Sequence, residues 1–165
     1  MALVIGDSSV LIHLSRIDRL YLLNKFFSSI VIPPAVWHEV VTEGKGRAGA
    51  TEVEQAKKAG WLHVTQPQNK NLVHLLQQQL DVGEAEAIAM AIENNGSLLL
   101  IDEADARKIA DIYNVTFIGT IGLLIRAHVE NNIESFQTEL DRLIHDGGFR
   151  ISQALYDKVV RQVNS

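Results

Sequence analysis

Short apolar runs alternate with amphipathic stretches along the whole chain, and this alternation constrains the fold more than any other feature. The apolar runs predict strands at residues 2–5, 29–32, 61–64, 97–102 and 115–118. Between them, apolar residues recur every three or four positions, as they do in amphipathic helices. Strands that alternate with helices in this way favour a parallel sheet covered on both faces. We therefore expect an α/β fold of three layers, α/β/α, around a mostly parallel central sheet.

The predicted helices differ in how clearly the sequence marks their ends. The clearest covers residues 83–94, with apolar residues at i, i+3, i+4 and i+7 on one face. Asp18 is expected to cap a short helix over residues 18–26. Pro34 opens another helix, because proline is well tolerated at the first helical position, and the glycines that follow end it. The remaining predicted helices cover residues 8–15, 50–59, 71–80, 103–113, 120–130, 135–145 and 152–163.

Length and composition indicate an ordinary globular chain. Its 165 residues are enough for one domain with a sizeable core and too few for two ordinary ones. Apolar residues make up 47% and charged residues 21%, which is typical of globular proteins rather than disordered tails. No repeat, linker or low-complexity segment interrupts the pattern. We therefore expect a single domain over residues 1–165.

The sequence also indicates where the protein works. No apolar run approaches the roughly 18 residues of a membrane span. Asp7 interrupts the apolar N-terminal stretch, which argues against a secretory signal. The chain has no cysteine, which excludes disulfides and thiolate metal sites. We expect a cytoplasmic protein without a membrane partner.

Charge alone gives little support to a nucleic-acid-binding protein. The net charge of −5 argues against binding through a broad basic face, but it does not exclude a protein whose carboxylates gather around metal ions. The positions of the acids are more informative. Asp7 follows the first predicted strand and Asp102 ends the fourth. Because the carboxyl ends of parallel strands meet at one edge of the sheet, both are expected to project over the same edge.

Acids on predicted helices are expected to join this edge. Glu39 lies in an unusually apolar neighbourhood, and Glu84 and Glu86 lie in the first turn of a helix. Asp105 follows Asp102 by three residues and faces roughly the same direction. Carboxylates that converge in this way repel one another unless cations lie between them.

The type of ligand indicates the type of cation. Oxygen ligands without histidine or cysteine suit Mg²⁺ or Mn²⁺, which keep several waters and bind substrate phosphates. Such a site can activate water and stabilise the leaving oxygen in phosphodiester hydrolysis. Ser8 and Ser9 are expected to support the site, because their hydroxyls can hold Asp7 in place and cap the following helix.

Each acid also has a simpler interpretation. Asp7 can be only a helix cap, and Glu84 and Glu86 can merely complement a helix dipole. Asp102 can be an ordinary helix start, and Glu39 can lie on a solvated face. The metal site is favoured because strand order and helix phase bring every one of these acids toward one edge.

Four segments of the chain resemble, in order, the motifs of the PIN domain family, which is the fold of VapC-type toxin ribonucleases and related nucleases. They are VIGDSSVLIHLSRI, IPPAVWHEV, GEAEAIAMA and LLLIDEADARKIA. The later segments FIGTIGLLIRA and GFRISQALYDKVV are similar to a bacterial and archaeal branch of PIN proteins. The resemblance covers nearly the whole chain.

The resemblance implies catalytic, metal-binding acids at Asp7, Glu39, Glu86 and Asp102. It implies that Asp105 either supports these acids without binding the first metal or helps to bind a second metal. It also allows Thr120 to donate a hydrogen bond to a phosphate. Aligning the third motif from its glycine favours Glu86 and leaves Glu84 as a peripheral acid. Positions two apart on a helix differ by about 200°, so both cannot face one ion, and which of them is the third ligand stays open.

The resemblance also implies an activity and partners. A metal-dependent endoribonuclease would hydrolyse RNA phosphodiester bonds with Mg²⁺ or Mn²⁺ and leave 5′-phosphate and 3′-hydroxyl ends. It would be the toxin of a toxin–antitoxin pair, with a small antitoxin protein as partner, and it would form a homodimer. Contacts to RNA are expected from Arg16, Lys45, Arg47 and Arg107. The alternative is a PIN-fold module that binds nucleic acid or protein with weak catalysis, and the four intact acids argue against it.

Other motifs fail in their context. GKGRAG, at residues 44–49, matches a dinucleotide-binding pattern, but it follows a helix and has no acid about 20 residues on. HEVVT lacks the second histidine of a zinc-protease helix, and the other histidines, His13 among them, are expected at the surface or at caps. A phosphoaspartyl enzyme of the haloacid-dehalogenase type needs an aspartate where Ser9 stands.

Overall fold

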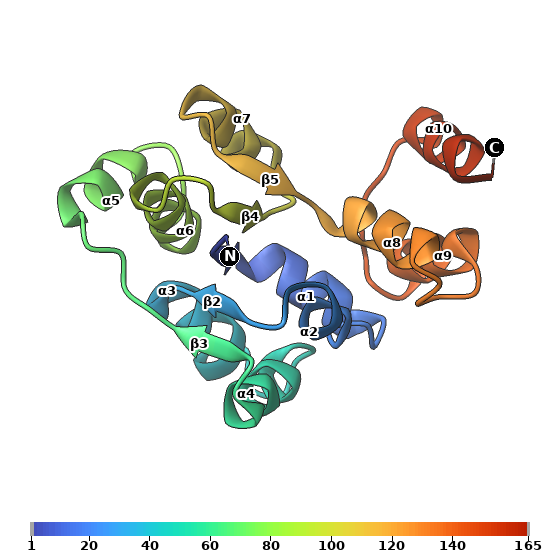
Figure 1. Cartoon of the computed structure of the whole chain (residues 1–165), viewed down its shortest axis with the longest axis horizontal. Coiled ribbons are helices and arrows are strands. Elements are labelled where there is room, and N and C mark those ends of the chain that lie inside the picture. Colours follow the sequence, from blue (N-terminus) through green and yellow to red (C-terminus); the bar gives the residue numbers. More distant parts are fainter. Residues whose placement is uncertain (1, 165) are drawn as a thin grey trace.

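The computed structural model describes residues 2–164, and its strands form one parallel sheet (Figure 1). The strands are β1 (Val4–Gly6), β2 (Ile30–Ile32), β3 (Leu62–Val64), β4 (Leu98–Leu100) and β5 (Thr116–Ile118). Their order in the sheet is β3-β2-β1-β4-β5, and every pair of neighbours is parallel. In the central strand, Ile5 lies opposite Val31 on one side and Leu99 on the other. The predicted parallel sheet is confirmed, and its strands are shorter than the apolar runs from which they were predicted.

The helices cover most of the remaining chain. They are α1 (Ser8–Arg16), α2 (Leu22–Phe27), α3 (Pro34–Trp37), α4 (Ala50–Ala59), α5 (Lys70–Leu76), α6 (Val82–Glu93), α7 (Ala104–Ile112), α8 (Thr120–Val129), α9 (Phe136–His145) and α10 (Gln153–Asn164). One further turn, η1 (His38–Thr42), is a π-helix that continues α3. None of the helices within residues 2–164 is long and apolar enough to cross a membrane.

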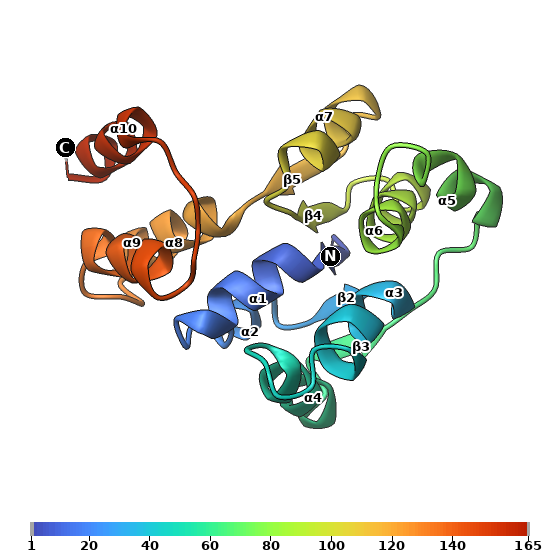
Figure 2. The same cartoon turned by 180° about the vertical axis from the view of Figure 1, so that it is seen from behind.

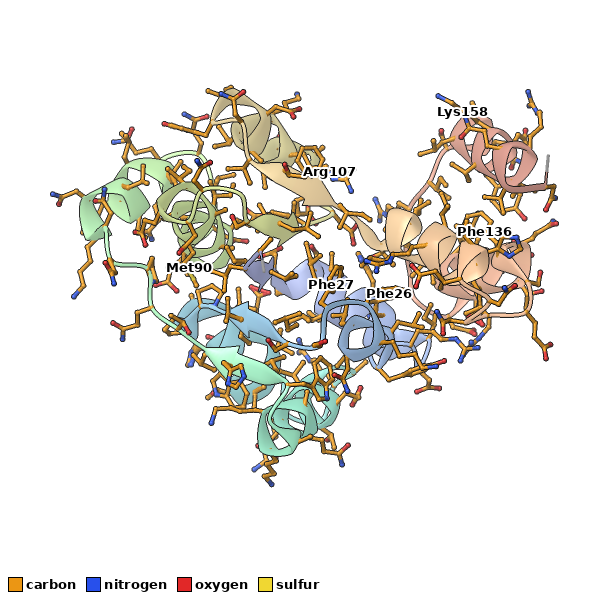
Figure 3. The ribbon with its side chains drawn as sticks, viewed as in Figure 1. Phe26, Phe27, Met90, Arg107, Phe136 and Lys158 are labelled. Carbon is orange, nitrogen blue, oxygen red and sulfur yellow. The ribbon has the colours of Figure 1, made fainter. Side chains whose placement is uncertain are left out.

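The sheet separates two apolar layers, because successive strand residues point to opposite faces. Val4 and Leu100 join a core cluster with α1, α2, α4, α8 and α9. Ile5 and Leu99 join a second cluster with α5, α6 and α7, in which Met90 is fully buried (Figure 3). Figures 1 and 2 both show α5 and α6 on the opposite side of the molecule from α8 and α9. The three-layer α/β/α architecture predicted from the alternating pattern is therefore confirmed.

The structure corrects two predicted helices. The helix expected from Asp18 begins at Leu22, and Asp18 itself has a φ of 57°, a left-handed conformation rather than a helix cap. The helix expected after Pro34 widens at His38, where the backbone N–H of Glu43 donates to the carbonyl of His38 at 2.8 Å. Single π-turns of this kind are rare and often occur at functional sites, and this one carries Glu39.

Candidate active site

A cleft opens at the carboxyl end of the sheet, where the strand order changes direction. The chain fills the sheet from β1 to β3 on one side and continues with β4 and β5 on the other, so β1 and β4 flank the switch point. Open parallel sheets place their binding crevices at this position. The backbone N–H of Asp7 donates to the carbonyl of Leu100 at 3.0 Å and joins the ends of the two strands. The cleft has a volume of about 550 Å³.

Acidic side chains dominate the lining of this cleft. Those that line it are Asp7, Glu39, Asp81, Glu84, Glu103 and Asp105. Ser8, Ser9, His13 and Arg16 from α1 complete its polar wall. Six carboxylates around one cavity give it a strongly negative potential, which favours a bound cation.

Asp7 is the most constrained of these acids. It is the N-cap of α1, and its Oδ2 accepts hydrogen bonds from the backbone N–H of Ser9 at 3.4 Å and from the Ser9 hydroxyl at 3.0 Å. Its other oxygen, Oδ1, is buried without a hydrogen-bond partner among the described residues. Burial raises the pKa of Asp7 to about 7, although the hydrogen bonds from Ser9 oppose the shift. A buried carboxylate oxygen without a partner is uncommon and costs free energy, unless an ion binds it.

Asp102 lies beside the cleft and is engaged through both of its oxygens. Oδ1 accepts from the backbone N–H of Thr120 at 2.8 Å, and Oδ2 accepts from the Thr120 hydroxyl at 2.7 Å. Oδ2 also lies 2.7 Å from Nδ1 of His13. Burial acts to raise the pKa of Asp102, but the hydrogen bonds from His13 and Thr120 outweigh it and hold the pKa below its ordinary value. Asp102 is therefore an ionised carboxylate that orients His13 and the start of α8.

Ser9 connects the two aspartates. Its hydroxyl donates to Asp7, as described above, and accepts from the backbone N–H of Asp102 at 3.3 Å. The predicted support of Asp7 by Ser9 is present in the structure. Ser8 also lies in the wall of the cleft.

The start of α6 directs the two glutamates of the third motif to different places. Asp81 caps the helix by accepting from the backbone N–H of Glu84 at 2.8 Å, and Glu84 returns the contact by accepting from the backbone N–H of Asp81 at 3.2 Å. This capping box turns Glu84 into the cleft. Burial raises the pKa of Glu84 to about 7, with further contributions from the charges of Asp81 and Asp7.

Glu86 lies outside the cleft. Its Oε1 accepts from the backbone N–H of Ala35 at 2.9 Å, and the side chain lines a separate pocket with Lys70 and His74. The reason is helix geometry, since Glu86 is two positions after Glu84 on α6 and therefore faces another side of the helix. The structure thus places Glu84, not the favoured Glu86, beside Asp7. The D-x-x-E pattern of residues 81–84 is a sequence signal that would have shown this.

His13 is the most informative of the cleft residues that the sequence did not indicate. It was expected at the surface or at a cap, but it lines the cleft and pairs with Asp102. The available signal was helical spacing, because Ser9, His13 and Arg16 follow one another at i, i+4 and i+7 on α1 and share one face. Asp81 and Glu103 were also missed.

The predicted RNA-binding cations do not form one group. Arg16 lines the cleft and donates to the carbonyl of Gly147 at 2.8 Å. Lys45 and Arg47 are exposed on the loop before α4 and are not among the residues that line the cleft. Arg107 donates to the carbonyl of Ile101 at 3.0 Å and lies on the other side of Asp102.

The donors of the cleft fit a hard divalent cation. Within residues 2–164, no three acidic or histidine side chains are close enough together to hold a metal ion by themselves. Mg²⁺ does not require such a cage, because it is usually bound by one or two carboxylates, several waters and substrate phosphates. The unpartnered Oδ1 of Asp7 is one such donor, and the half-buried carboxyl group of Glu84 is a second beside the same cleft.

These features define a class of protein: an α/β fold of nuclease type, with an acidic cleft at the switch point of an all-parallel sheet. The chain belongs to the PIN domain family, since the family model described as a PIN domain matches residues 3–165. PIN domains are generally nucleases that use divalent metal ions and bind RNA or other nucleic acids. Among curated proteins, no sequence matches this chain.

Proposed function

We propose that this protein is an endoribonuclease that hydrolyses RNA phosphodiester bonds with Mg²⁺ or Mn²⁺. The observation that carries the proposal is the buried Oδ1 of Asp7, which has no hydrogen-bond partner within residues 2–164 and belongs to a cleft lined by five further acids. Asp7 and Glu84 are the proposed principal ligands. Glu39 and Asp105, which line the same cleft, are proposed to bind the ion through water or to hold a second one.

A bound divalent ion supplies positive charge that stabilises the phosphodiester transition state and makes water a better nucleophile. The chain positions the groups around it. Ser9 holds Oδ2 of Asp7 and leaves Oδ1 free for the ion. The raised pKa values of Asp7 and Glu84 indicate that cation binding releases protons from these carboxyl groups near neutral pH.

His13 is proposed to act on a proton of the reaction. Asp102 is ionised and can only accept hydrogen bonds, so Nδ1 of His13 donates to it. This contact fixes the ring and leaves Nε2 to exchange a proton in the cleft that His13 lines. Thr120 holds the same carboxylate from the other side, so Asp102 and Thr120 are positioning residues in this proposal.

The toxin role is the finer part of the proposal, and the resemblance of the sequence motifs to VapC-type toxins supports it. It implies growth arrest on expression and rescue by a small antitoxin protein. A homodimer is implied in the same way. Expression of the wild type and of Asp7→Asn in a bacterial host tests the toxin role, because only the wild type is expected to stop growth. Equal growth of both cultures would reject it.

Purified protein with a single-stranded RNA and Mn²⁺ tests the nuclease itself. Cleavage by the wild type and no cleavage by Asp7→Asn is the expected result. Glu86→Gln is a matched control, because Glu86 is a neighbouring glutamate of α6 that lies outside the cleft. Cleavage that persists in Asp7→Asn, or disappears equally in Glu86→Gln, would refute the assignment.

A second candidate is a PIN-fold module that binds nucleic acid without efficient cleavage. One observation favours it: both oxygens of Asp102 are occupied by protein donors, so this acid is not available to an ion. Calorimetric titration with Mn²⁺ separates the candidates. The nuclease is expected to bind Mn²⁺ through Asp7, whereas a binding module is expected to bind it weakly and equally in Asp7→Asn.

A further inference from the structure

A second pocket lies on the far side of Asp102 from the acidic cleft. It has a volume of about 430 Å³ between the end of β5, the start of α8 and α10. We call it the α10 pocket, and the residues that matter for its chemistry are Arg107, Phe117, Phe149, Arg150, Leu155 and Val159. In Figures 1 and 2, α10 lies across from β5 and α7 in both views.

The wall between the two cavities is thin. Asp102 lines the α10 pocket, while its hydrogen-bond partner His13 lines the acidic cleft. The ring of His13 also contacts the ring of Phe149 edge-on, at 4.9 Å between centroids. The hydrogen-bonded pair His13–Asp102 therefore belongs to the wall that the two cavities share.

The two cavities differ in charge. The acidic cleft carries six carboxylates, whereas Asp102 is the one acid among the described residues that line the α10 pocket, and its side chain is 7% exposed. Arg107 lies 3.8 Å from Oδ1 of Asp102 and stacks over Phe117 at 5.2 Å. Arg150 is exposed and has no ion-pair or hydrogen-bond partner among the described residues. The α10 pocket therefore suits an anion.

The pocket also has an apolar surface for a planar group. Phe117 of β5 and Phe149 line it with their rings, and Leu155 and Val159 line it from α10. Leu155 is 42% exposed, so its side chain is accessible to a bound group. Adjacent arginine and aromatic side chains are the combination that binds single-stranded nucleic acid, with cations on the phosphates and rings on the bases.

We propose that the α10 pocket binds a single-stranded segment of RNA that continues from the phosphodiester in the acidic cleft. This inference rests on the proposed function of that cleft. Arg150 and Arg107 bind a backbone phosphate, and a base of the same segment lies against Phe149 and Leu155. A duplex does not fit this arrangement, because its bases are stacked inside and do not present a free face to the pocket. The pocket selects single-stranded or looped RNA.

Fluorescence anisotropy tests the proposal without cleavage. The probe is a labelled single-stranded RNA of about 12 nucleotides, with a chelator present and salt kept constant. Arg150→Glu is expected to weaken binding by at least about tenfold. Arg161→Glu is the matched control, since Arg161 is an exposed arginine of α10 outside the pocket, and it is expected to change the affinity by less than about threefold.

A second pair of variants tests the apolar surface. Leu155→Asp is expected to weaken binding by about tenfold or more. Leu75→Asp is its control, because Leu75 is 55% exposed on α5, on the opposite side of the molecule from α10 (Figure 1). Circular dichroism and melting curves verify that all four variants are folded.

Several results would overturn the proposal. Equal weakening of RNA binding by Arg150→Glu and Arg161→Glu would show that only the overall charge of the protein matters. Tighter binding of a duplex of the same sequence would exclude selection of single strands. If Leu155→Asp changes the mass of the protein in light scattering and leaves RNA affinity unchanged, the pocket joins copies of the chain instead. The nuclease assay tests the acidic cleft independently of the α10 pocket. If Asp7→Asn loses cleavage but keeps its affinity for RNA, the result concerns the acidic cleft alone.

Discussion

Replacing Asp7 by asparagine is expected to stabilise the protein without metal, and the gain is expected to grow with pH. The pKa of Asp7 is about 7 in the folded protein and has an ordinary value of 3.8. The folded state therefore binds more protons than the unfolded state between these values. Stability falls as pH rises through this window, because the unfolded chain releases the proton more readily. Asparagine does not titrate, so Asp7→Asn removes this loss of stability at higher pH.

The size of the effect follows from the burial of the carboxyl group. A difference of about 3 pKa units corresponds to about 4 kcal/mol when the group is fully ionised. Between about pH 5 and about pH 8, this ionisation lowers the unfolding free energy of the wild type by roughly 2–3 kcal/mol. Solvent screens little of it, because Asp7 is 1% exposed. The carboxylate of Asp102 does not interfere, since its lowered pKa confines its titration to more acidic solutions.

Urea denaturation with a chelator at both pH values measures the prediction. The quantity to compare is the difference in unfolding free energy between Asp7→Asn and the wild type. It is expected to increase by about 2–3 kcal/mol from about pH 5 to about pH 8. Asp111→Asn, which removes an exposed acid of α7, is expected to show a difference that stays constant. A constant difference for Asp7→Asn, or one that shrinks with pH, would refute the argument that Asp7 is a desolvated acid.

Three further predictions concern the cation and its surroundings. Mn²⁺ at about 100 times its dissociation constant is expected to stabilise the wild type by about 2.7 kcal/mol and to leave Asp7→Asn nearly unchanged in thermal melts; identical shifts would count against the site. In calorimetric titrations, Glu84→Gln is expected to weaken Mn²⁺ binding by about tenfold, whereas Glu86→Gln is expected to leave it unchanged, and the reverse result would restore Glu86 as the ligand. Thr120→Val removes the hydroxyl that donates to Asp102 and is expected to cost about 1–3 kcal/mol in urea denaturation; an unchanged midpoint would show that the backbone N–H of Thr120 suffices.

The fold was predictable because its signals are local. Alternation between short apolar runs and helical periodicity indicated the parallel sheet and the layers on both faces, and the structure confirms both. The errors arose where local signals conflict with packing. Asp18 is a good capping residue, but the chain turns through a left-handed conformation there, and the next helix starts at Leu22. The π-turn at Glu39 has no clear signal in the sequence.

The candidate site was predictable only in part. Asp7, Ser9 and Glu39, which the sequence predicted at one edge, all line the same cleft, and the positions of Asp7 and Ser9 follow from the end of β1 and the start of α1. It favoured Glu86 over Glu84, since a motif fixes the order of residues and not the phase of the helix that carries them. The capping box at Asp81 sets that phase, and it brings Glu84 to Asp7.

By itself, the sequence determined the class of fold, the strand that Asp7 follows and the acidic character of the edge beside it. These follow from residue types and periodicity, which act over a few neighbouring positions. Only the tertiary structure decided how the acids differ from one another. Within residues 2–164, one oxygen of Asp7 has no hydrogen-bond partner, while both oxygens of Asp102 accept hydrogen bonds from His13 and Thr120. Desolvation and hydrogen bonding set the chemistry of each carboxyl group, and both depend on residues that lie far apart in the chain.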